Sequence, residues 1–197
     1  MKGKLKLKLL DCTLRDGGYY NNWDFDELLV KKYLSAMSTA RVDIVEIGFR
    51  FLQQKKFLGK FAYCEDEYLN SLSLPSNISY AVMINASDLI NCEDGYEKAI
   101  NALFLKKKDS PIDIVRIATH VTDINECRLI AISLKNLGYK VCLNIMQISS
   151  MDSKAIAIAS KNIFSWKCID VLYFADSFGN LEPESIESII SVMSSQW

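Results

Sequence analysis

The stretch of sequence that decides the fold is Leu9-Leu10-Asp11-Cys12-Thr13-Leu14-Arg15-Asp16-Gly17-Gly18-Tyr19-Tyr20. An apolar run leads into adjacent Arg15 and Asp16, and two glycines follow. Paired glycines let the backbone turn at dihedral angles that other residues resist. A strand that ends in a charged pair and a glycine turn is typical of a catalytic βα loop. We therefore expect this segment to leave a buried strand and to form a polar loop.

The charged pair predicts a particular chemistry. The Asp16 carboxylate offers oxygen ligands, which suit magnesium or manganese. The Arg15 guanidinium can stabilise an oxyanion or a substrate carboxylate through its planar fork of donors. The alternative is a solvated turn that holds a surface ion pair. Polar residues at the ends of the other expected strands would favour the functional interpretation over the surface ion pair.

Outward from this stretch, the chain repeats a strand followed by a helix six times, at roughly 30-residue intervals. The expected strands are 4–10, 42–49, 78–84, 112–118, 140–148 and 169–174. The expected helices begin near Asp24 or Asp26, at Glu65, at Glu93, at Asp123, at Asp152 and at Pro183. This alternation predicts an α/β fold with a parallel sheet and crossover helices. Because no linker rich in Gly, Pro or Ser divides the chain, we expect a single domain over residues 1–197.

Polar side chains follow nearly every expected strand. These clusters are Arg15-Asp16, Glu46 with Arg50, Asn85, Thr119-His120, Asn144 with Gln147, and Asp176-Ser177. Parallel α/β enzymes place their ligands at the carboxyl ends of the strands, so several clusters there favour a functional site over a surface ion pair. The segment 50–63 is a long loop with three lysines, which predicts either a cover over an anionic substrate or a solvated loop.

Each candidate side chain has a structural alternative. Glu46 supports Arg15 or a metal site, or forms a buried ion pair with Arg50 or Arg116. Asn144 orients a substrate carbonyl group or satisfies neighbouring backbone groups. Asp176 and Ser177 contact the substrate or cap a helix. The lone His120 touches the substrate or forms a hydrogen bond at the rim. The residues alone leave these alternatives open.

Composition excludes several classes of protein. The net charge is −1 over 197 residues, which argues against nucleic acid as a partner. The six cysteines are scattered without a C-x-x-C pair, which argues against a zinc finger or a disulfide scaffold. We read no signal peptide and no run long enough to span a bilayer. We expect a cytoplasmic protein that acts on a small molecule and contacts no membrane.

Three segments resemble one enzyme superfamily. They are Thr13-Leu14-Arg15-Asp16-Gly17, Val45-Glu46-Ile47-Gly48-Phe49-Arg50 and Ala175-Asp176-Ser177-Phe178-Gly179. The chain resembles the DRE-TIM metallolyases, which include 3-hydroxy-3-methylglutaryl-CoA lyase, isopropylmalate synthase and the carboxyltransferase domain of pyruvate carboxylase. Its first segment looks most like the aldolase-type branch, which contains 4-hydroxy-2-oxovalerate aldolase. The resemblance implies a TIM (β/α)8 barrel, here incomplete with about six βα units.

The resemblance also implies roles for individual residues. Asp16 corresponds to a ligand of the divalent metal, Mn or Mg, and Arg15 corresponds to the residue that stabilises the enolate. This agrees with physical chemistry, since breaking a carbon–carbon bond beside a ketone places negative charge on one oxygen. Aldolase members place a base after the R-D-G motif, where this chain has Tyr19 and Tyr20, and we assign Tyr20 to catalysis. The expected substrate-binding residues are Glu46, Arg50, Asn144, Asp176 and Ser177.

The chain departs from the superfamily in two respects, of which the first is that Tyr19 and Tyr20 stand where aldolase members often place a histidine base. Second, the remaining metal ligands of the family are two histidines on the seventh strand, whereas this chain has one histidine, His120, and about six units. On its own we expect it to bind metal poorly. Six units leave two sheet edges exposed, so we expect a homo-oligomer in which another copy covers them.

These features predict a metal-dependent carbon–carbon lyase of the aldolase type that acts on a 2-oxo acid or a similar enolisable substrate. One alternative is a Claisen-type enzyme that condenses an acyl-CoA, as isopropylmalate synthase does. The other is a non-catalytic barrel remnant that lacks the metal-binding histidines.

Overall fold

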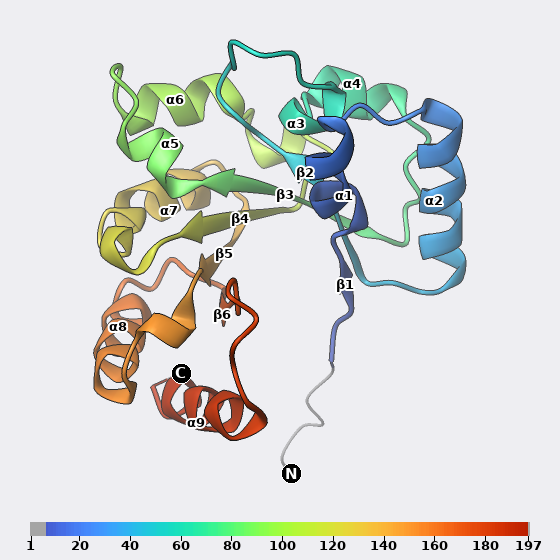
Figure 1. Cartoon of the computed structure of the whole chain (residues 1–197). Coiled ribbons are helices and arrows are strands. Elements are labelled where there is room, and N and C mark those ends of the chain that lie inside the picture. Colours follow the sequence, from blue (N-terminus) through green and yellow to red (C-terminus); the bar gives the residue numbers. More distant parts are fainter. Residues whose placement is uncertain (1–6, 197) are drawn as a thin grey trace. The chain divides into compact units, whose positions relative to one another are not determined.

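The computed structural model describes residues 7–196, whose strands and helices alternate along the chain as in an incomplete TIM barrel, and Figure 1 labels these elements. Within that range, the strands follow one another in the sheet in chain order, from β1 to β6. The pairs β1–β2, β2–β3 and β5–β6 are parallel. The strands are β1 (Leu10–Asp11), β2 (Ile44–Phe49), β3 (Ser79–Asn85), β4 (Ile114–Thr119), β5 (Lys140–Ile145) and β6 (Val171–Phe174).

Helices alternate with these strands, as the sequence pattern predicts. They are α1 (Thr13–Asn21), α2 (Glu27–Thr39), α3 (Lys60–Tyr63), α4 (Asp66–Ser71), α5 (Ala86–Ile90), α6 (Tyr96–Leu103), α7 (Cys127–Asn136), α8 (Ser153–Ser165) and α9 (Pro183–Ser194). Short 3-10 turns occur at Lys107–Asp109, Val121–Asp123 and Ile148–Ser150. None of the helices in the described part of the chain is both long and apolar enough to cross a membrane.

The chain forms two compact units. The first contains the residues up to Met83 and the segment Leu105–Ile114, and the second contains Ile84–Phe104 and the residues from Val115 onward. The expectation of a single domain over residues 1–197 stays a prediction.

In the first unit, the core is built on β2. Val45 and Ile47 are fully buried, and Phe49 is 1% exposed, so both faces of this strand are covered. A strand that is apolar on both faces is typical of a parallel sheet. The pairing of β2 with β3 shifts its register between Glu46 and Gly48, at the carboxyl half of the strand.

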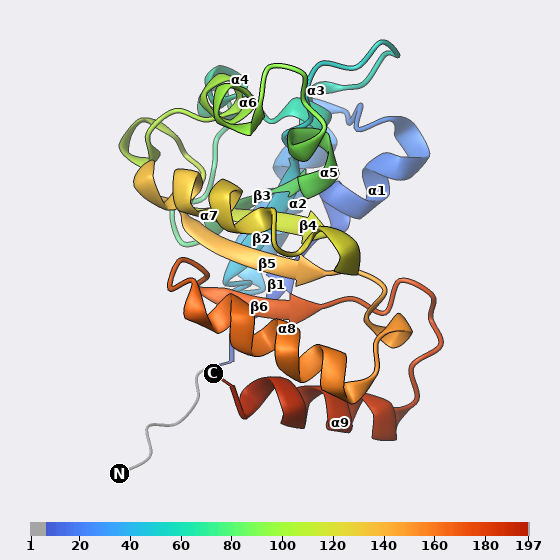
Figure 2. The same cartoon turned by 90° about the vertical axis from the view of Figure 1, so that its left-hand side faces the viewer.

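In the second unit, β5 pairs with β6, and α8 packs against α9 (Figure 2). Val141, Leu143 and Ile145 of β5 are buried.

Aspartate side chains cap two of the helices. The Asp152 side chain accepts a hydrogen bond of 2.7 Å from the Ala155 backbone N–H at the start of α8. In the first unit, Asp26 accepts one of 2.9 Å from Leu29 and begins α2. Asp152 is a predicted cap, and Asp26 is one of the two predicted alternatives, Asp24 or Asp26; such caps satisfy backbone N–H groups that have no partner within the helix.

The expected glycine loop after Asp16 is wrong, because residues Thr13–Asn21 form helix α1. Asp11 at the end of β1 contacts the first residue of this helix, since its carboxylate accepts a 2.9 Å hydrogen bond from the Thr13 backbone N–H. Gly18 lies inside the helix for a packing reason: a Cβ added there would lie 2.0 Å from Cδ1 of Trp23. A close contact, and not a left-handed turn, therefore requires this glycine.

Several predicted boundaries are also wrong. The first strand, expected over 4–10, is Leu10–Asp11 within the described residues, and positions 4–6 lie outside them. The end of the expected loop 50–63 contains α3, and α5 begins directly after Asn85, where residues 85–88 are expected to form a polar segment. The helix expected from Asp123 begins at Cys127, after a 3-10 turn. Short helices of four or five residues carry little periodic signal, which is why the sequence pattern missed them.

Candidate active site

The candidate site in the first unit is an ion-pair chain that runs from the interior to the surface. Arg15 lies on α1, and its Nε donates a hydrogen bond of 2.7 Å to Oε2 of Glu46 on β2. Its Nη1 donates to Oδ1 of Asp16. The exposed fractions of the three side chains are 0% for Glu46, 16% for Arg15 and 53% for Asp16. The guanidinium is thus anchored on its buried side and reaches solvent beside Asp16.

The surroundings keep Arg15 charged. Burial lowers the pKa of its guanidinium, but the neighbouring carboxylates of Glu46 and Asp16 outweigh burial and raise it. A permanent positive charge held by two carboxylates is suited to stabilising an oxyanion, because the charge needs no reorganisation when negative charge develops nearby.

Cys12 adds a second contact to Asp16. Its Sγ donates a hydrogen bond of 3.1 Å to Oδ2 of Asp16. Burial, together with this hydrogen bond and the charge of Asp16, raises the pKa of the Cys12 thiol to about 11. The thiol is therefore neutral near pH 7, and it acts as a donor to the carboxylate and not as a nucleophile.

A cluster of aromatic rings lies beside Arg15. The Arg15 Cζ lies 5.9 Å from the centroid of Phe49, and Phe49 stacks on Phe51 at 4.3 Å. Trp23 contacts both phenylalanines edge-on, at 5.5 Å and 5.3 Å. Its indole Nε1 donates a 2.9 Å hydrogen bond to the backbone carbonyl of Arg15. Sequence reasoning missed Trp23, because it lies beyond the end of α1 in a left-handed backbone conformation that no periodic pattern predicts.

The two tyrosines of α1 differ in environment. Tyr20 is 94% exposed. Tyr19 lies edge-on to Trp23, with ring centroids 4.9 Å apart. Burial raises the pKa of the Tyr19 hydroxyl, and the charge of Arg15 acts in the opposite direction. Tyr19 is therefore coupled electrostatically to the Arg15–Asp16 pair.

Arg50 follows β2 and is 2% exposed. It forms an ion pair with Asp66 on α4. Asp66 also accepts a hydrogen bond of 2.5 Å from Oγ of Ser110, and that oxygen accepts one of 3.1 Å from the backbone N–H of Ile112. Arg50 therefore helps to join segments of the first unit, and its role in substrate binding stays a prediction.

The remaining predicted residues belong to the second unit. Asn144 on β5 is 6% exposed and pairs in register with Tyr173 on β6. Asp176 accepts hydrogen bonds from the backbone N–H groups that follow it, at 3.2 Å and 3.0 Å. Ser177 accepts one of 3.1 Å from the Gln147 backbone, so the structure brings these two predicted strand-end residues together. Asp176 thus holds the loop that follows it and does not cap α9, whose N-cap is Glu182, so the predicted capping role is wrong, while its substrate contact stays a prediction.

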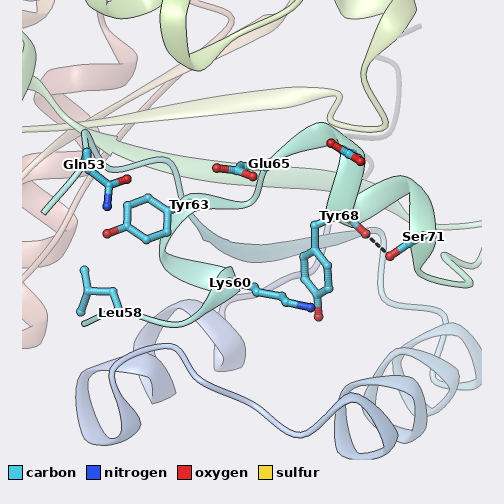
Figure 3. A pocket seen from close by; sticks show the side chains of 8 residues that line it. Gln53, Leu58, Lys60, Tyr63, Glu65, Tyr68 and Ser71 are labelled. Atoms are coloured by element: carbon cyan, nitrogen blue, oxygen red, sulfur yellow. Dashed lines mark hydrogen bonds between the residues drawn. The ribbon is translucent and has the colours of Figure 1, made fainter. Parts of the chain in front are cut away.

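A cavity of about 500 Å³ also opens in the first unit (Figure 3). Side chains from α3, α4 and the preceding loop line it: Gln53, Leu58, Lys60, Tyr63, Glu65, Glu67, Tyr68 and Ser71. Lys60 Nζ lies 4.4 Å from the centroid of the Tyr68 ring. No residue of the predicted site lines this cavity.

The resemblance implies a divalent metal, which would need several ligands from this chain. Asp16 has a half-exposed carboxylate and fits as one oxygen ligand. Among residues 7–196, however, no three His, Cys, Asp or Glu side chains come together in an arrangement that could hold a metal ion. The described residues thus supply one ligand and do not complete a site.

Comparison with known proteins gives consistent results. The chain is 24% identical over 190 residues to 4-hydroxy-2-oxovalerate aldolase of Pelotomaculum thermopropionicum. The matched region covers 95% of this chain and 53% of that relative. It resembles the solved N-terminal domain of a candidate aldolase from Bacteroides vulgatus, with 30% identity and a TM-score of 0.82, covering 96% of this chain and 60% of that one. No family model matches.

More distant structures share the fold. Hydroxymethylglutaryl-CoA lyase of Pseudomonas aeruginosa has a TM-score of 0.70 at 13% identity, over 97% of this chain and 64% of that one. The carboxyl transferase domain of Rhizobium etli pyruvate carboxylase has a TM-score of 0.72 at 12% identity, over 99% of this chain and 34% of that one.

Together, the fold and these similarities confirm that the chain has the DRE-TIM metallolyase fold and covers part of its barrel. Of these proteins, the two with the higher sequence identity are an aldolase and the domain of a candidate aldolase. Within the superfamily it resembles the aldolase-type branch, represented by 4-hydroxy-2-oxovalerate aldolase. The chain spans about half the length of that curated relative.

Proposed function

We propose that this chain is part of a divalent-metal-dependent carbon–carbon lyase of the aldolase type, which acts on a 2-oxo acid or a similar enolisable small molecule. The observation that carries the proposal is the Arg15 guanidinium, anchored on fully buried Glu46 and turned toward solvent beside Asp16. Cleavage beside a ketone leaves an enolate, and a fixed guanidinium lowers the barrier by stabilising its oxygen.

Asp16 is the proposed metal ligand, and Mn or Mg the proposed metal. The cation, when bound, supplies Lewis-acid stabilisation of the same developing charge. The missing ligands would be histidines of a seventh strand, so the proposal concerns the protein that carries this chain. Glu46, Arg50, Asn144, Asp176 and Ser177 remain the proposed substrate-binding set.

The proton-transfer group is proposed to come from α1. Tyr20 is the residue assigned from the sequence, and its exposure leaves it accessible to solvent. Tyr19 is the alternative, supported by its electrostatic coupling to Arg15 and Asp16. Phenylalanine substitutions separate them, because only loss of the acting hydroxyl changes the pH profile of kcat.

The test uses the purified protein that contains residues 1–197 together with any barrel units that follow them in the gene. With Mn²⁺ present, we expect release of pyruvate or a related oxo acid from a 4-hydroxy-2-oxo acid. Arg15→Lys should lower kcat by about 10²–10³-fold, the effect of losing a fixed donor to an oxyanion. Arg128→Lys, an exposed arginine on α7, is the matched control and should leave kcat unchanged.

Asp16→Asn should remove the response of the rate to Mn²⁺, whereas Asp94→Asn on the surface should retain it. Turnover that is absent in the wild type, or insensitive to both site substitutions, would contradict the proposal. Release of a free thiol from acetyl-CoA in the presence of a 2-oxo acid would instead identify the Claisen-type reaction.

Two further expectations belong to this proposal. The strands β1 and β6 lie at the two ends of the sheet order, and uncovered sheet edges favour association. We propose a homo-oligomer, which light scattering on the purified protein would detect as a mass above that of one chain. The cytoplasm is the proposed compartment, and fractionation of the source cells tests it.

A further inference from the structure

The helix that carries Arg15 has few features that would hold it by itself. Helix α1 has nine residues and contains two glycines, and glycine is the poorest helix former after proline. Helices of this length are marginal in isolation, so contacts from outside the helix must fix it. The Arg15 side chain has such a contact in Glu46, but a side-chain contact alone does not fix the backbone from which it projects.

Trp23 supplies the contact to the backbone. Its indole Nε1 donates a 2.9 Å hydrogen bond to the Arg15 carbonyl. The residue is 5% exposed and adopts a left-handed backbone conformation, with φ of 57°. Its own N–H donates to the Gly18 carbonyl at 3.1 Å and to the Asn21 side chain at 3.1 Å. The chain thus folds back directly after α1, and the indole returns to the residue that bears the guanidinium.

Gly18 provides the space for this ring. A Cβ added to Gly18 would lie 2.0 Å from Cδ1 and 2.1 Å from Nε1 of Trp23. Adjacent Gly17 is different, because its Cβ would meet only Phe25, at 3.6 Å, an ordinary contact. The two glycines therefore form a matched pair, in which one is required by the indole and the other is not.

We infer that Trp23 is a positioning residue: it fixes the main chain at Arg15, while Glu46 fixes the side chain, so that the guanidinium keeps one orientation. This inference rests on the proposed function for its catalytic consequence. Its structural part, that the indole N–H holds α1, stands on the contacts of the first unit alone.

The experiment compares substitutions of two buried tryptophans. Trp23→Phe removes the indole N–H, and Trp166→Phe is the control, since Trp166 also donates through Nε1, at 3.3 Å to Asn162 in the second unit. Hydrogen exchange of the peptide 13–22 reports on α1, and steady-state kinetics with a 4-hydroxy-2-oxo acid and Mn²⁺ report on Arg15. If Trp23→Phe fails to fold, incorporating 3-benzothienylalanine at position 23 keeps the shape of the ring without its N–H.

For Trp23→Phe we expect exchange in 13–22 to accelerate about fivefold, the change expected for loss of one neutral hydrogen bond. We expect kcat to fall about tenfold or more with KM altered less than about twofold, because small misplacements of a catalytic group affect the chemical step. Trp166→Phe should change neither quantity. Gly18→Ala should reproduce the effects of Trp23→Phe, and Gly17→Ala should not.

Three results would overturn the inference. Exchange in 13–22 equal for both tryptophan variants would show that the indole does not hold α1. Faster exchange with unchanged kcat would reduce Trp23 to a structural role. Equal effects of Gly17→Ala and Gly18→Ala would remove the packing argument. Absence of turnover in the wild type would refute the proposed function and the catalytic part of this inference, while the exchange result would still decide whether Trp23 holds the helix.

Discussion

Replacing Glu46 with glutamine tests how strongly the interior of the first unit depends on the charge pair. Glutamine has nearly the same shape and keeps an acceptor for Arg15 Nε, so the substitution removes the charge and little else. Removing one partner of a buried ion pair costs about 3–5 kcal/mol, because the other charge is left without compensation. Arg15 retains Asp16, whose side chain is 53% exposed and screened by water, so we expect the lower end of that range.

Glu46→Gln should therefore lower the free energy of unfolding by about 3 kcal/mol. For a chain of this size, this corresponds to a fall in Tm of roughly 6–12 °C. Urea unfolding followed by tryptophan fluorescence measures the first quantity, and calorimetry measures the second. Lys98→Met is the control, since it breaks the exposed pair with Asp94, which is worth about 0.5 kcal/mol or less. If Glu46→Gln and Lys98→Met had equal effects, the argument that the buried carboxylate stabilises Arg15 would be refuted.

Three further outcomes are expected. Burial opposes ionisation of Asp11, but hydrogen bonds that include one from Tyr33 outweigh it and lower the pKa of Asp11. The ionised Asp11 carboxylate therefore stabilises the chain above about pH 4, and this stabilisation is lost as the pH falls through the lowered pKa. The Tm difference between wild type and Asp11→Asn should shrink between about pH 5 and pH 2. Asp16→Asn should lower the pKa of the Cys12 thiol from about 11 and accelerate its alkylation by iodoacetamide at pH 8, measured by peptide mass spectrometry. Gly48→Ala should destabilise the chain by about 1–3 kcal/mol in urea unfolding, since its Cβ would lie 2.0 Å from a backbone oxygen of α3.

The repeating units could be predicted from the sequence because their signals are local. Apolar runs of four to eight residues gave strands two to six within a few residues of their observed bounds. Asp26 and Asp152 precede apolar-periodic segments, and both cap helices in the structure. Caps and buried strands depend on residues that are neighbours in sequence, so the sequence pattern contains most of the required information.

Helix α1 could not be predicted in this way. Adjacent glycines normally indicate a turn, and that expectation is wrong here because Gly18 makes room for the ring of Trp23. The contact becomes visible only when the segment is already helical. The pairing of Arg50 with Asp66 is missed for a similar reason. The sequence contains several acidic residues that could pair with each arginine. Only the position of α4 within the first unit determines that Asp66 pairs with Arg50.

The helical conformation of this segment changes the interpretation of the charged pair itself. Successive side chains on a helix project about 100° apart, so Arg15 and Asp16 do not face in the same direction. The structure uses this difference, since Arg15 extends to buried Glu46 while Asp16 faces solvent and accepts from Cys12. The long arginine side chain still lets Nη1 contact Asp16. A glycine loop would leave both directions free to vary. A helix tied by Trp23 fixes them, and a reacting site needs such fixation because groups on rigid elements hold their geometry better than groups on loops.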